Sequence, residues 1–312
     1  IKYFWGIKNM TKAKKHQGIV LKNLLSENKP VLAPGVFSPL VAMMAEKKGF
    51  KSLYFSGASF SAMNGIPDIG LFTFQELFDS VLSITKMTNV PIIVDVDTGF
   101  GEPINVVRTA TDLESINVAA IQIEDQLFPK RCGHLDGKEL ISAQDFAKKI
   151  YAAKSATTDL MIIARTDAKA VEGIDSAVER AKIYKDAGAD IIFPEALETE
   201  EEFKIFAESV DIDLLANMTE FGKTPYFTAQ QFFDLGYKII IYPVSSLRIA
   251  MSAVNDLFGE ILGSGTQVNY VEDMFTRKDL YKLIDYDKYV KLDQSLGGDD
   301  LIDKKGDNNE WF

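Results

Sequence analysis

Eight short apolar runs, each followed by a stretch with helical character, restrict the fold of this chain more than any other feature. The runs are rich in β-branched residues and bounded by turn residues, and they cover residues 31–37, 52–57, 91–99, 119–125, 160–167, 190–196, 213–220 and 238–246. Parallel strands that are covered by helices have this near-continuous apolar character. The alternation predicts an α/β fold, a (β/α)8 TIM-type barrel, with a doubly wound open sheet as the alternative.

Helix boundaries between the runs support the same prediction. Thr73 precedes Glu76 by three positions, which is the pattern of a capping box at a helix start. The helical stretch that follows Glu172 stops at Gly188, directly before the next apolar run. We therefore expect the strands to alternate with helices along the chain.

The last residues of these runs are polar, whereas the first residues are not. The polar ends are Ser56, Asp95, Asp97, Gln122, Glu124, Arg165, Asp167, Glu195, Asn217, Thr219 and Ser245. Several lie two residues apart and so face the same side of a strand. In a barrel these ends would meet at one rim, where active sites of this fold lie. The alternative is that the strands end in polar residues simply because they reach water there.

Composition excludes several other functions. The 312 residues are 46% apolar, enough for one large domain, and they carry a net charge of −11, which disfavours binding to nucleic acid or to an anionic membrane. No stretch approaches the roughly 18 apolar residues of a membrane span. A single cysteine allows no intramolecular disulfide, so we expect a reducing, cytoplasmic location. Met10 is a plausible natural start.

The expected rim favours a metal site made of oxygen ligands. Clustered carboxylates without a nearby pair of histidines suit Mg²⁺ or Mn²⁺, and two histidines are too few for a three-histidine zinc centre. No strand end carries a lysine for Schiff-base chemistry, and Lys130 in a loop is the one close candidate. Arginines at positions 165, 248 and 277 could bind a carboxylate substrate.

The loop "KRCGH" after the fourth run contains the chain's one cysteine. Cys132 follows Lys130 and Arg131, whose positive charges would stabilise a thiolate, whereas a lone cysteine is more commonly a small buried apolar residue. Gly133 and Gly137 give the backbone freedom that a closing loop needs. We therefore expect Cys132 to act as a general acid or base.

A resemblance to a known family rests on motifs that recur in order from about Val31 to Tyr289. "IEDQ", "KRCGH", "VDVDTGFGEPINVVRT", "ARTDAKAVEGIDSAVERA", "FPEA", "LANMTEFGKTP", "YPVSSLR" and the "GTQ…MFTR" tail are similar to those of 2-methylisocitrate lyases, in the isocitrate lyase and phosphoenolpyruvate mutase superfamily. Together these motifs are highly specific, whereas any single one is not.

The resemblance implies a role for each matching residue. Asp95 and Asp97 would hold Mg²⁺, with Asp68 and Glu124 acting through water, and Cys132 would be the catalytic acid or base. The substrate would contact Ser56, Gly57, Ala58, Gly133, Arg165, Glu195, Asn217, Met218, Thr219, Arg248 and Arg277. The chain departs from the family at "SGAS", where the family has SGGG, and at Gln122, where a histidine is common.

The implied reaction is Mg²⁺-dependent cleavage of 2-methylisocitrate, a tricarboxylate, to pyruvate and succinate in the methylcitrate cycle of propionate catabolism. Phe193 and Val244 form an apolar wall that leaves room for the substrate's extra methyl group, where isocitrate-cleaving relatives carry Trp and a polar Thr or Ser. Three alternatives remain: an isocitrate lyase, an oxaloacetate-type hydrolase of the same superfamily, and a non-catalytic barrel.

The expected organisation is simple. Residues 1–15 form an N-terminal extension, residues 16–296 a single barrel domain with C-terminal helices, and residues 297–312 a Gly-rich, charged and flexible tail. The resemblance implies a homotetramer in which the C-terminal helices are exchanged between subunits.

Overall fold

A computed structural model describes residues 15–131, 133 and 137–297. Cys132 and most of the predicted C-terminal tail lie outside these described residues. The described chain divides into two compact units, the first ending at Met251 and the second beginning at Ser252. The predicted domain of residues 16–296 spans both units, and each unit is described by itself. No helix in the described ranges is long and apolar enough to span a membrane.

Eight parallel strands form the sheet of the first unit, in the order β1-β8-β7-β6-β5-β4-β3-β2. They are β1 (Val31–Pro34), β2 (Leu53–Phe55), β3 (Ile92–Asp95), β4 (Ala120–Glu124), β5 (Met161–Thr166), β6 (Ile191–Pro194), β7 (Asp213–Asn217) and β8 (Tyr237–Tyr242). Each lies within or overlaps one of the eight apolar runs, so the strand predictions are confirmed.

The sheet closes between β1 and β2. Gly35 pairs with Tyr54 as a parallel bridge, and the amide of Val36 donates to the carbonyl of Tyr54 at 2.8 Å. Gly35 can cross between its two neighbours because it has no side chain: a Cβ at this position would lie 2.1 Å from the carbonyl oxygen of Pro243. The predicted TIM-type barrel is therefore confirmed, and the open doubly wound sheet is excluded.

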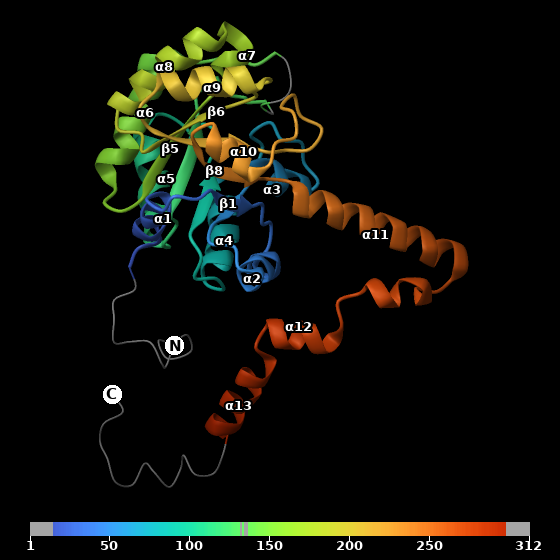
Figure 1. The fold of residues 1–312 in the computed structure, drawn as a ribbon. Helices are drawn as coiled ribbons and strands as arrows, with labels where there is room; N and C mark the ends of the chain where they lie inside the picture. The colour runs from blue at the N-terminus through green and yellow to red at the C-terminus, as the bar shows by residue number, and fades with distance from the viewer. Residues whose placement is uncertain (1–14, 132, 134–136, 298–312) are drawn as a thin grey trace, which may run out of the picture. The chain divides into compact units, whose positions relative to one another are not determined.

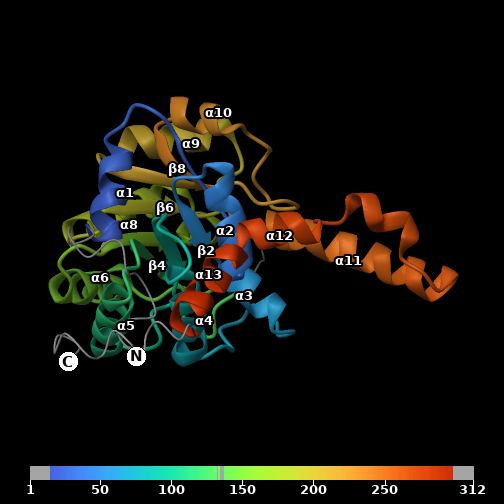
Figure 2. The ribbon, with the colours of Figure 1, turned by 90° about the horizontal axis from the view of Figure 1, so that it is seen from below.

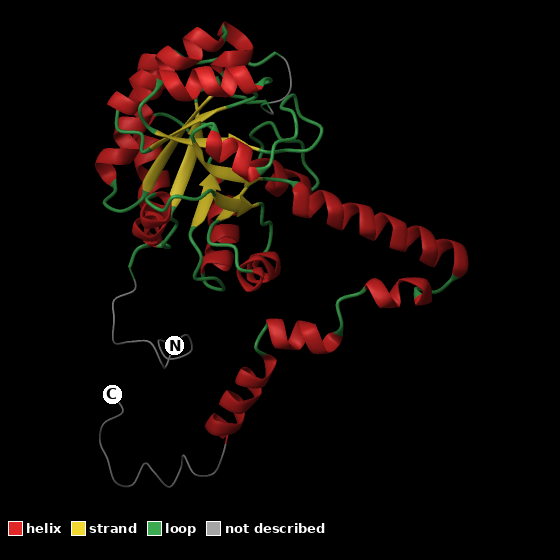
Figure 3. Cartoon of the chain, in the orientation of Figure 1, coloured by secondary structure: helices red, strands yellow, loops and turns green. Residues whose placement is uncertain are grey.

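Helices surround the strands of the first unit (Figures 1 and 3). They are α1 (Gln17–Leu25), α2 (Pro39–Lys48), α3 (Gly57–Met63), α4 (Phe74–Thr85), α5 (Pro103–Ser115), α6 (Ala143–Ala156), α7 (Ala168–Glu172), α8 (Ile174–Asp186), α9 (Glu200–Ser209) and α10 (Ala229–Asp234). Thr73 and Glu76 form the predicted capping box of α4, and Gly188, with φ of 104°, follows the end of α8. Both helix-boundary predictions are confirmed.

The chain continues through α11 (Ser245–Ser264), which crosses the division between the units. The 3-10 helix η1 (Val268–Asp273), α12 (Arg277–Leu283) and α13 (Tyr286–Gly297) follow in the second unit. Leu283 is the one apolar side chain that this unit buries within the described residues. Its apolar surface is therefore largely exposed in the single chain.

Two apolar cores hold the barrel. The larger lies between the strands and the outer helices, and the smaller fills the barrel interior with side chains such as Ala33, Ile93, Ile163 and Leu215. Helix α1, visible with the strands in Figure 2, closes the N-terminal end through Leu21 and Leu25, which belong to the interior core. The opposite end of the barrel is left for polar side chains.

Candidate active site

The carboxyl ends of the strands meet at a cavity of about 90 Å³ in the barrel mouth. Its walls come from all parts of the barrel and consist of Tyr54, Ser56, Ala58, Asp68, Asp95, Lys130, Arg131, Gly133, Arg165, Phe193, Glu195, Asn217, Thr219, Ile241, Pro243, Val244 and Arg248. Twelve of these residues were predicted from the sequence as site residues. Six of the eleven predicted polar strand ends line this cavity, whereas Asp97 lines a neighbouring one.

Asp95 and Asp97 lie on a buried acidic turn at the end of β3. The amide of Gly57 donates to Asp95 Oδ2 at 3.0 Å, and the amide of Asp97 donates to Asp95 Oδ1 at 3.1 Å. A Cβ at Gly57 would lie 3.1 Å from one oxygen of each aspartate. The two carboxylates therefore approach a common point, and glycine at position 57 gives them that space.

Lys130 places a buried ammonium beside this turn. Its Nζ lies 3.0 Å from Asp97 Oδ1 and also forms an ion pair with Asp68. Burial alone would lower the pKa of Lys130, but Asp97, Glu124 and Asp68 raise it above its ordinary value. Lys130 is therefore a fixed positive charge, which is unsuited to Schiff-base chemistry because that requires a neutral amine.

Burial makes the acidic side chains of the site harder to ionise than the same groups in water. Burial raises the pKa of Asp95, and it raises that of Asp97 to about 7, although Lys130 opposes both shifts. Burial also raises the pKa of Glu124 well above its usual range, against the opposing charge of Arg165. Both carboxylate oxygens of Glu124 are buried and accept no hydrogen bond within the described residues. The cluster therefore favours additional positive charge.

The carboxylate of Asp167 fixes Arg165, at the end of β5, through two hydrogen bonds. Asp167 accepts from Arg165 Nε at 2.9 Å and from Nη2 at 3.1 Å. Arg165 Nη1 faces Glu124 at 3.4 Å and Glu195 at 3.6 Å, and the guanidinium lies over the ring of Phe193, 5.4 Å from its centre. Burial opposes ionisation of Asp167, but Arg165 and Lys138 hold its pKa at about 2. The guanidinium is thus fixed in one orientation.

The cysteine-containing loop is anchored on both sides of position 132. The side-chain amide of Gln126 exchanges two hydrogen bonds with the backbone of Arg131, at 2.8 and 2.9 Å. Lys138 Nζ donates to the carbonyl of Gly133 and to Asp167 Oδ1, the latter at 2.8 Å. Gly133 therefore lies directly beside the Arg165–Asp167 ion pair. Cys132 itself lies outside the described residues.

Strands β6 and β7 place the remaining polar groups. Asn217 Nδ2 lies 3.4 Å from Glu195 Oε1, and Thr219 is buried in the cavity wall. Met218 differs from the expectation: its side chain packs in the outer core, where its sulfur accepts the amide of Phe227 at 3.4 Å. Strand alternation explains this direction, because Met218 lies between two inward-facing neighbours. Its side chain is absent from the cavity wall.

Four further predicted residues complete the wall. Ser56 caps α3 by accepting the amide of Ser59, and Ala58 lies in the first turn of that helix. Val244 directly precedes α11, and Arg248 lies in the first turn of that helix, with its Nε 3.6 Å from Glu220. Arg277 is the first residue of α12 in the second unit, so it is described apart from the barrel.

Several residues of the mouth were not assigned a role from the sequence. Tyr54 donates to Gln122 Oε1 at 2.6 Å, and both lie inside the barrel. Asp125 is fully buried and accepts from Thr166 at 2.8 Å, from Tyr184 at 2.7 Å and from the amide of Asp167 at 3.0 Å. Strand alternation points Tyr54 toward Ser56, two residues on, so the sequence did contain a signal for it. It contained none for Asp125.

Comparison with known proteins identifies the family of this chain. A sequence model of the family described as phosphoenolpyruvate phosphomutase matches residues 21–262, most of the chain. The chain belongs to the phosphoenolpyruvate phosphomutase family. The resemblance to its superfamily that the motifs indicated is therefore confirmed.

Relatives within the phosphoenolpyruvate phosphomutase family cover nearly the whole chain. A 2-methylisocitrate lyase from Aeropyrum pernix is 53% identical over 89% of this chain and 91% of its own. Another from Halalkalibacterium halodurans is 47% identical over 91% of this chain and 95% of its own. The crystal structure of a 2,3-dimethylmalate lyase matches with a TM-score of 0.84 at 32% identity, covering 90% of this chain and 96% of its own.

Proposed function

We propose that this protein is a Mg²⁺-dependent carbon–carbon lyase that cleaves 2-methylisocitrate to pyruvate and succinate. One observation carries the proposal: a single small cavity combines the acidic turn at Asp95 with fixed cations at Lys130 and Arg165. The two 2-methylisocitrate lyases at 53% and 47% identity support the choice of substrate. Neither isocitrate cleavage nor oxaloacetate hydrolysis is better supported than cleavage of 2-methylisocitrate.

The acidic turn suits a small hard cation. Asp95 and Asp97 present converging carboxylate oxygens, and Glu124 adds buried oxygens that accept no hydrogen bond from the described residues. Within the described ranges, no three His, Cys, Asp or Glu side chains could enclose a metal by themselves. Mg²⁺ commonly takes one or two carboxylates and completes its shell with water and substrate oxygens. We therefore assign Asp95 and Asp97 as ligands, with Asp68 and Glu124 acting through water and Mn²⁺ as a possible substitute.

The substrate's carboxylates require positive charge and hydrogen-bond donors around the cavity. Arg165 is pre-oriented by Asp167, and Arg248, in the first turn of α11, also lines the cavity. Asn217, Thr219 and Ser56 add neutral polar groups to the wall of the cavity. Arg277, Gly57, Ala58, Gly133 and Glu195 complete the substrate contacts that the family motifs imply.

Cleavage breaks the bond between the hydroxyl-bearing carbon and the adjacent carbon. A base accepts the hydroxyl proton as the carbonyl of pyruvate forms, and the electron pair of the broken bond moves into the succinate half, where its carboxylate delocalises the charge. Bound Mg²⁺ would polarise the developing carbonyl. The fixed charge of Arg165 stabilises the anionic half because the guanidinium does not have to reorient during the reaction.

Cys132 is the proposed acid that returns a proton to the succinate carbon. Its neighbours support this role: Gln126 fixes the backbone of Arg131, and Gly133 lies beside Arg165 and Glu195. Positive charge from Lys130 and Arg131 would stabilise the thiolate that remains after proton transfer. The role is taken from the family motif "KRCGH".

Selectivity for the methyl group is proposed to rest on two apolar residues. Phe193 and Val244 both line the cavity, and Phe193 is also covered by the guanidinium of Arg165. An apolar wall can discriminate one methyl group by roughly ten- to two-hundredfold. We therefore expect preference for 2-methylisocitrate without complete exclusion of isocitrate.

A homotetramer with exchanged C-terminal helices is part of this proposal. Phe258, Leu262, Phe275 and Tyr286 are exposed in the single chain, and Leu283 alone is a buried apolar residue among the described part of the second unit. Exposed apolar patches of this kind mark association surfaces. Light scattering coupled to gel filtration should give four chains, and removal of residues 265–312 should lower that number. An unchanged mass after truncation would contradict exchange through these helices.

A lyase assay tests the central proposal. Pyruvate formed from 2-methylisocitrate is followed with a lactate dehydrogenase couple, and succinate is quantified separately. Equimolar pyruvate and succinate, dependent on Mg²⁺, are expected. Equal or faster glyoxylate release from isocitrate would assign the chain as an isocitrate lyase. Oxalate and acetate from oxaloacetate, with no cleavage of either tricarboxylate, would assign it as a hydrolase.

We also propose a cytoplasmic location. An acid or base role for Cys132 requires a free thiol, and cytoplasmic redox conditions maintain one. Fractionation of cells producing the native protein, with antibody detection, should place it in the cytoplasmic fraction.

A further inference from the structure

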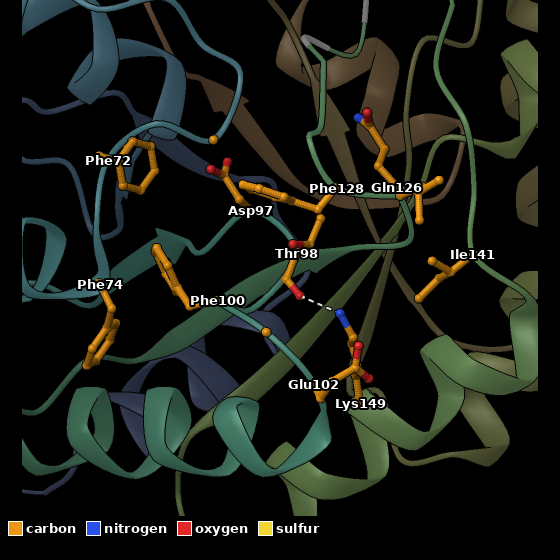
Figure 4. Close-up of a pocket in the computed structure, with 13 residues that line it drawn as sticks. Phe72, Phe74, Asp97, Thr98, Phe100, Glu102, Gln126, Phe128, Ile141 and Lys149 are labelled. Atoms are coloured by element: carbon orange, nitrogen blue, oxygen red, sulfur yellow. Dashed lines mark hydrogen bonds between the residues drawn. The ribbon is translucent and has the colours of Figure 1, made fainter.

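A second cavity, of about 640 Å³, lies beside the acidic turn but outside the barrel mouth. It is formed by Gly70, Phe72, Phe74, Asp97, Thr98, Phe100, Gly101, Glu102, Gln126, Leu127, Phe128, Ile141 and Lys149, and Figure 4 shows these side chains around the space. None of them lines the cavity of the barrel mouth. Its volume lies in the range of sites that bind small molecules.

Four phenylalanines contribute to the wall of this cavity. The ring of Phe100 lies edge-to-face between Phe72 and Phe74, with centroid distances of 5.9 and 5.4 Å. On another side, Phe128 is 60% exposed and Leu127 is 46% exposed. Figure 4 shows Phe100 and Phe128 on separate parts of the wall. An apolar ligand body placed among them would remove these exposed side chains from water.

Lys149 on α6 adds a charged group to this apolar cavity. It is 8% exposed, and its Nζ donates to the carbonyl of Thr98 at 3.0 Å. The charge of Glu102 attracts this ammonium, but the two groups form no ion pair within 4.0 Å among the described residues, and burial still lowers the pKa of Lys149. An ammonium that is buried with one neutral hydrogen-bond acceptor and one more distant carboxylate retains much of its desolvation cost. A ligand carboxylate would offset this cost by forming a charge-assisted hydrogen bond.

We propose that this cavity binds a small monocarboxylate with an aromatic or branched apolar body. The carboxylate contacts Lys149, and the body lies among Phe100, Leu127 and Phe128. A second carboxylate on the ligand is disfavoured because Asp97 and Glu102 also line the space. The ligand class therefore differs from the tricarboxylate proposed for the barrel mouth, and the inference is independent of that proposed function.

Calorimetric titration with 3-phenylpropionate, using the full chain, tests the inference. Its neutral isostere 3-phenylpropan-1-ol serves as the uncharged comparison. The wild-type protein should bind the acid more tightly than the alcohol. Lys149→Met should weaken binding of the acid by about tenfold or more and leave binding of the alcohol unchanged, as expected for loss of one charge-assisted hydrogen bond. Lys148→Met is the matched control because Lys148 is exposed and pairs with Asp145 at the surface.

Phe128→Ala supplies a second test that does not alter the buried lysine. Phe128 is largely exposed, so the fold should survive, and binding of both probes should weaken. No binding of the acid by the wild-type protein up to about 10 mM, the weak end for a ligand of this size, would overturn the proposal. Equal affinity of wild-type protein and Lys149→Met for the acid would do the same, because it would place the acid elsewhere, for example at the barrel mouth.

Discussion

Gly133 lies so close to Arg165 that a Cβ at position 133 would be 2.5 Å from Nη2 of the arginine and equally close to Cγ of Glu195. No side chain fits there unless the loop or the guanidinium moves. The backbone of the cysteine-containing loop and the guanidinium of Arg165 are therefore in direct contact. The glycine of "KRCGH" permits this contact.

Gly133→Ala should consequently lower kcat/KM by about a hundredfold, because an error near 1 Å in the placement of reacting groups costs that much. The melting temperature should change little, since the loop is at the barrel mouth and not in a core. Normal activity in Gly133→Ala would show that the loop and Arg165 are not in contact during turnover.

Metal removal is the second prediction. EDTA should abolish activity and added Mg²⁺ or Mn²⁺ should restore it, because the acidic turn offers oxygen ligands suited to these ions. Asp95→Asn should raise the Mg²⁺ concentration needed for half-maximal rate. Full turnover in metal-free buffer would rule out the proposed metal site.

The third prediction concerns Cys132. If its thiol transfers a proton, Cys132→Ser should lower kcat by roughly a hundredfold or more, the usual effect of a positioned acid or base. Pyruvate binding, measured by calorimetry, should persist. Near-normal turnover would make Cys132 dispensable, whereas a variant that fails to fold would make it structural.

Substrate choice is the fourth prediction. Wild-type kcat/KM should be higher for 2-methylisocitrate than for isocitrate, and Phe193→Trp should narrow or reverse this preference because the larger ring fills the methyl space. The ratio of kcat/KM for the two substrates checks it. Equal values in the wild-type protein would show that Phe193 and Val244 do not set selectivity.

The fifth prediction follows from the raised pKa of Asp97. The carboxyl titrates near 3.8 when unfolded, but burial raises its pKa to about 7 in the folded, metal-free chain. Between these values the folded state binds more protons, so the free energy of unfolding should fall as pH rises through this window. Asp97→Asn should make the free energy of unfolding less dependent on pH in this range. The measurement is the melting temperature in EDTA from about pH 5 to about pH 8, the range containing the folded-state titration.

Added Mg²⁺ should restore part of the stability that the protein loses as pH rises. The cation binds the ionised carboxylate, so its stabilising effect should grow with pH in the wild-type protein. A melting temperature that Mg²⁺ raises equally in wild-type protein and Asp97→Asn would remove Asp97 from the proposed ligand set.

Strand positions and their inward-facing residues were predictable because both depend on local pattern. Eight apolar runs marked the strands, and two-residue spacing placed Asn217 with Thr219 in the wall of one cavity. Asp97 follows the end of β3 with a φ of 47°, so strand alternation does not describe its side chain, although its carboxylate still approaches that of Asp95 near Gly57. The same alternation turns Met218 outward, so the pattern of the strand was a better guide to its side chain than the family motif. Ser56, Arg165 and Glu195 reached the cavity as strand ends should.

The sequence by itself determined the barrel and the residues that face its mouth, because alternation and helix periodicity act over a few neighbouring residues. Tertiary structure decided which of those charges meet. Lys130 reaches Asp68 across 62 positions of sequence, and Asp125 reaches Tyr184 across 59. Such contacts depend on loop backbone geometry, including the positive φ of 47° at Asp97, and on how buried charges share a low-dielectric space. Local sequence patterns specify neither the loop geometry nor the sharing of buried charge. The orientation of Arg165, the buried ammonium of Lys130 and the cavity beside Lys149 are therefore features of the tertiary structure alone.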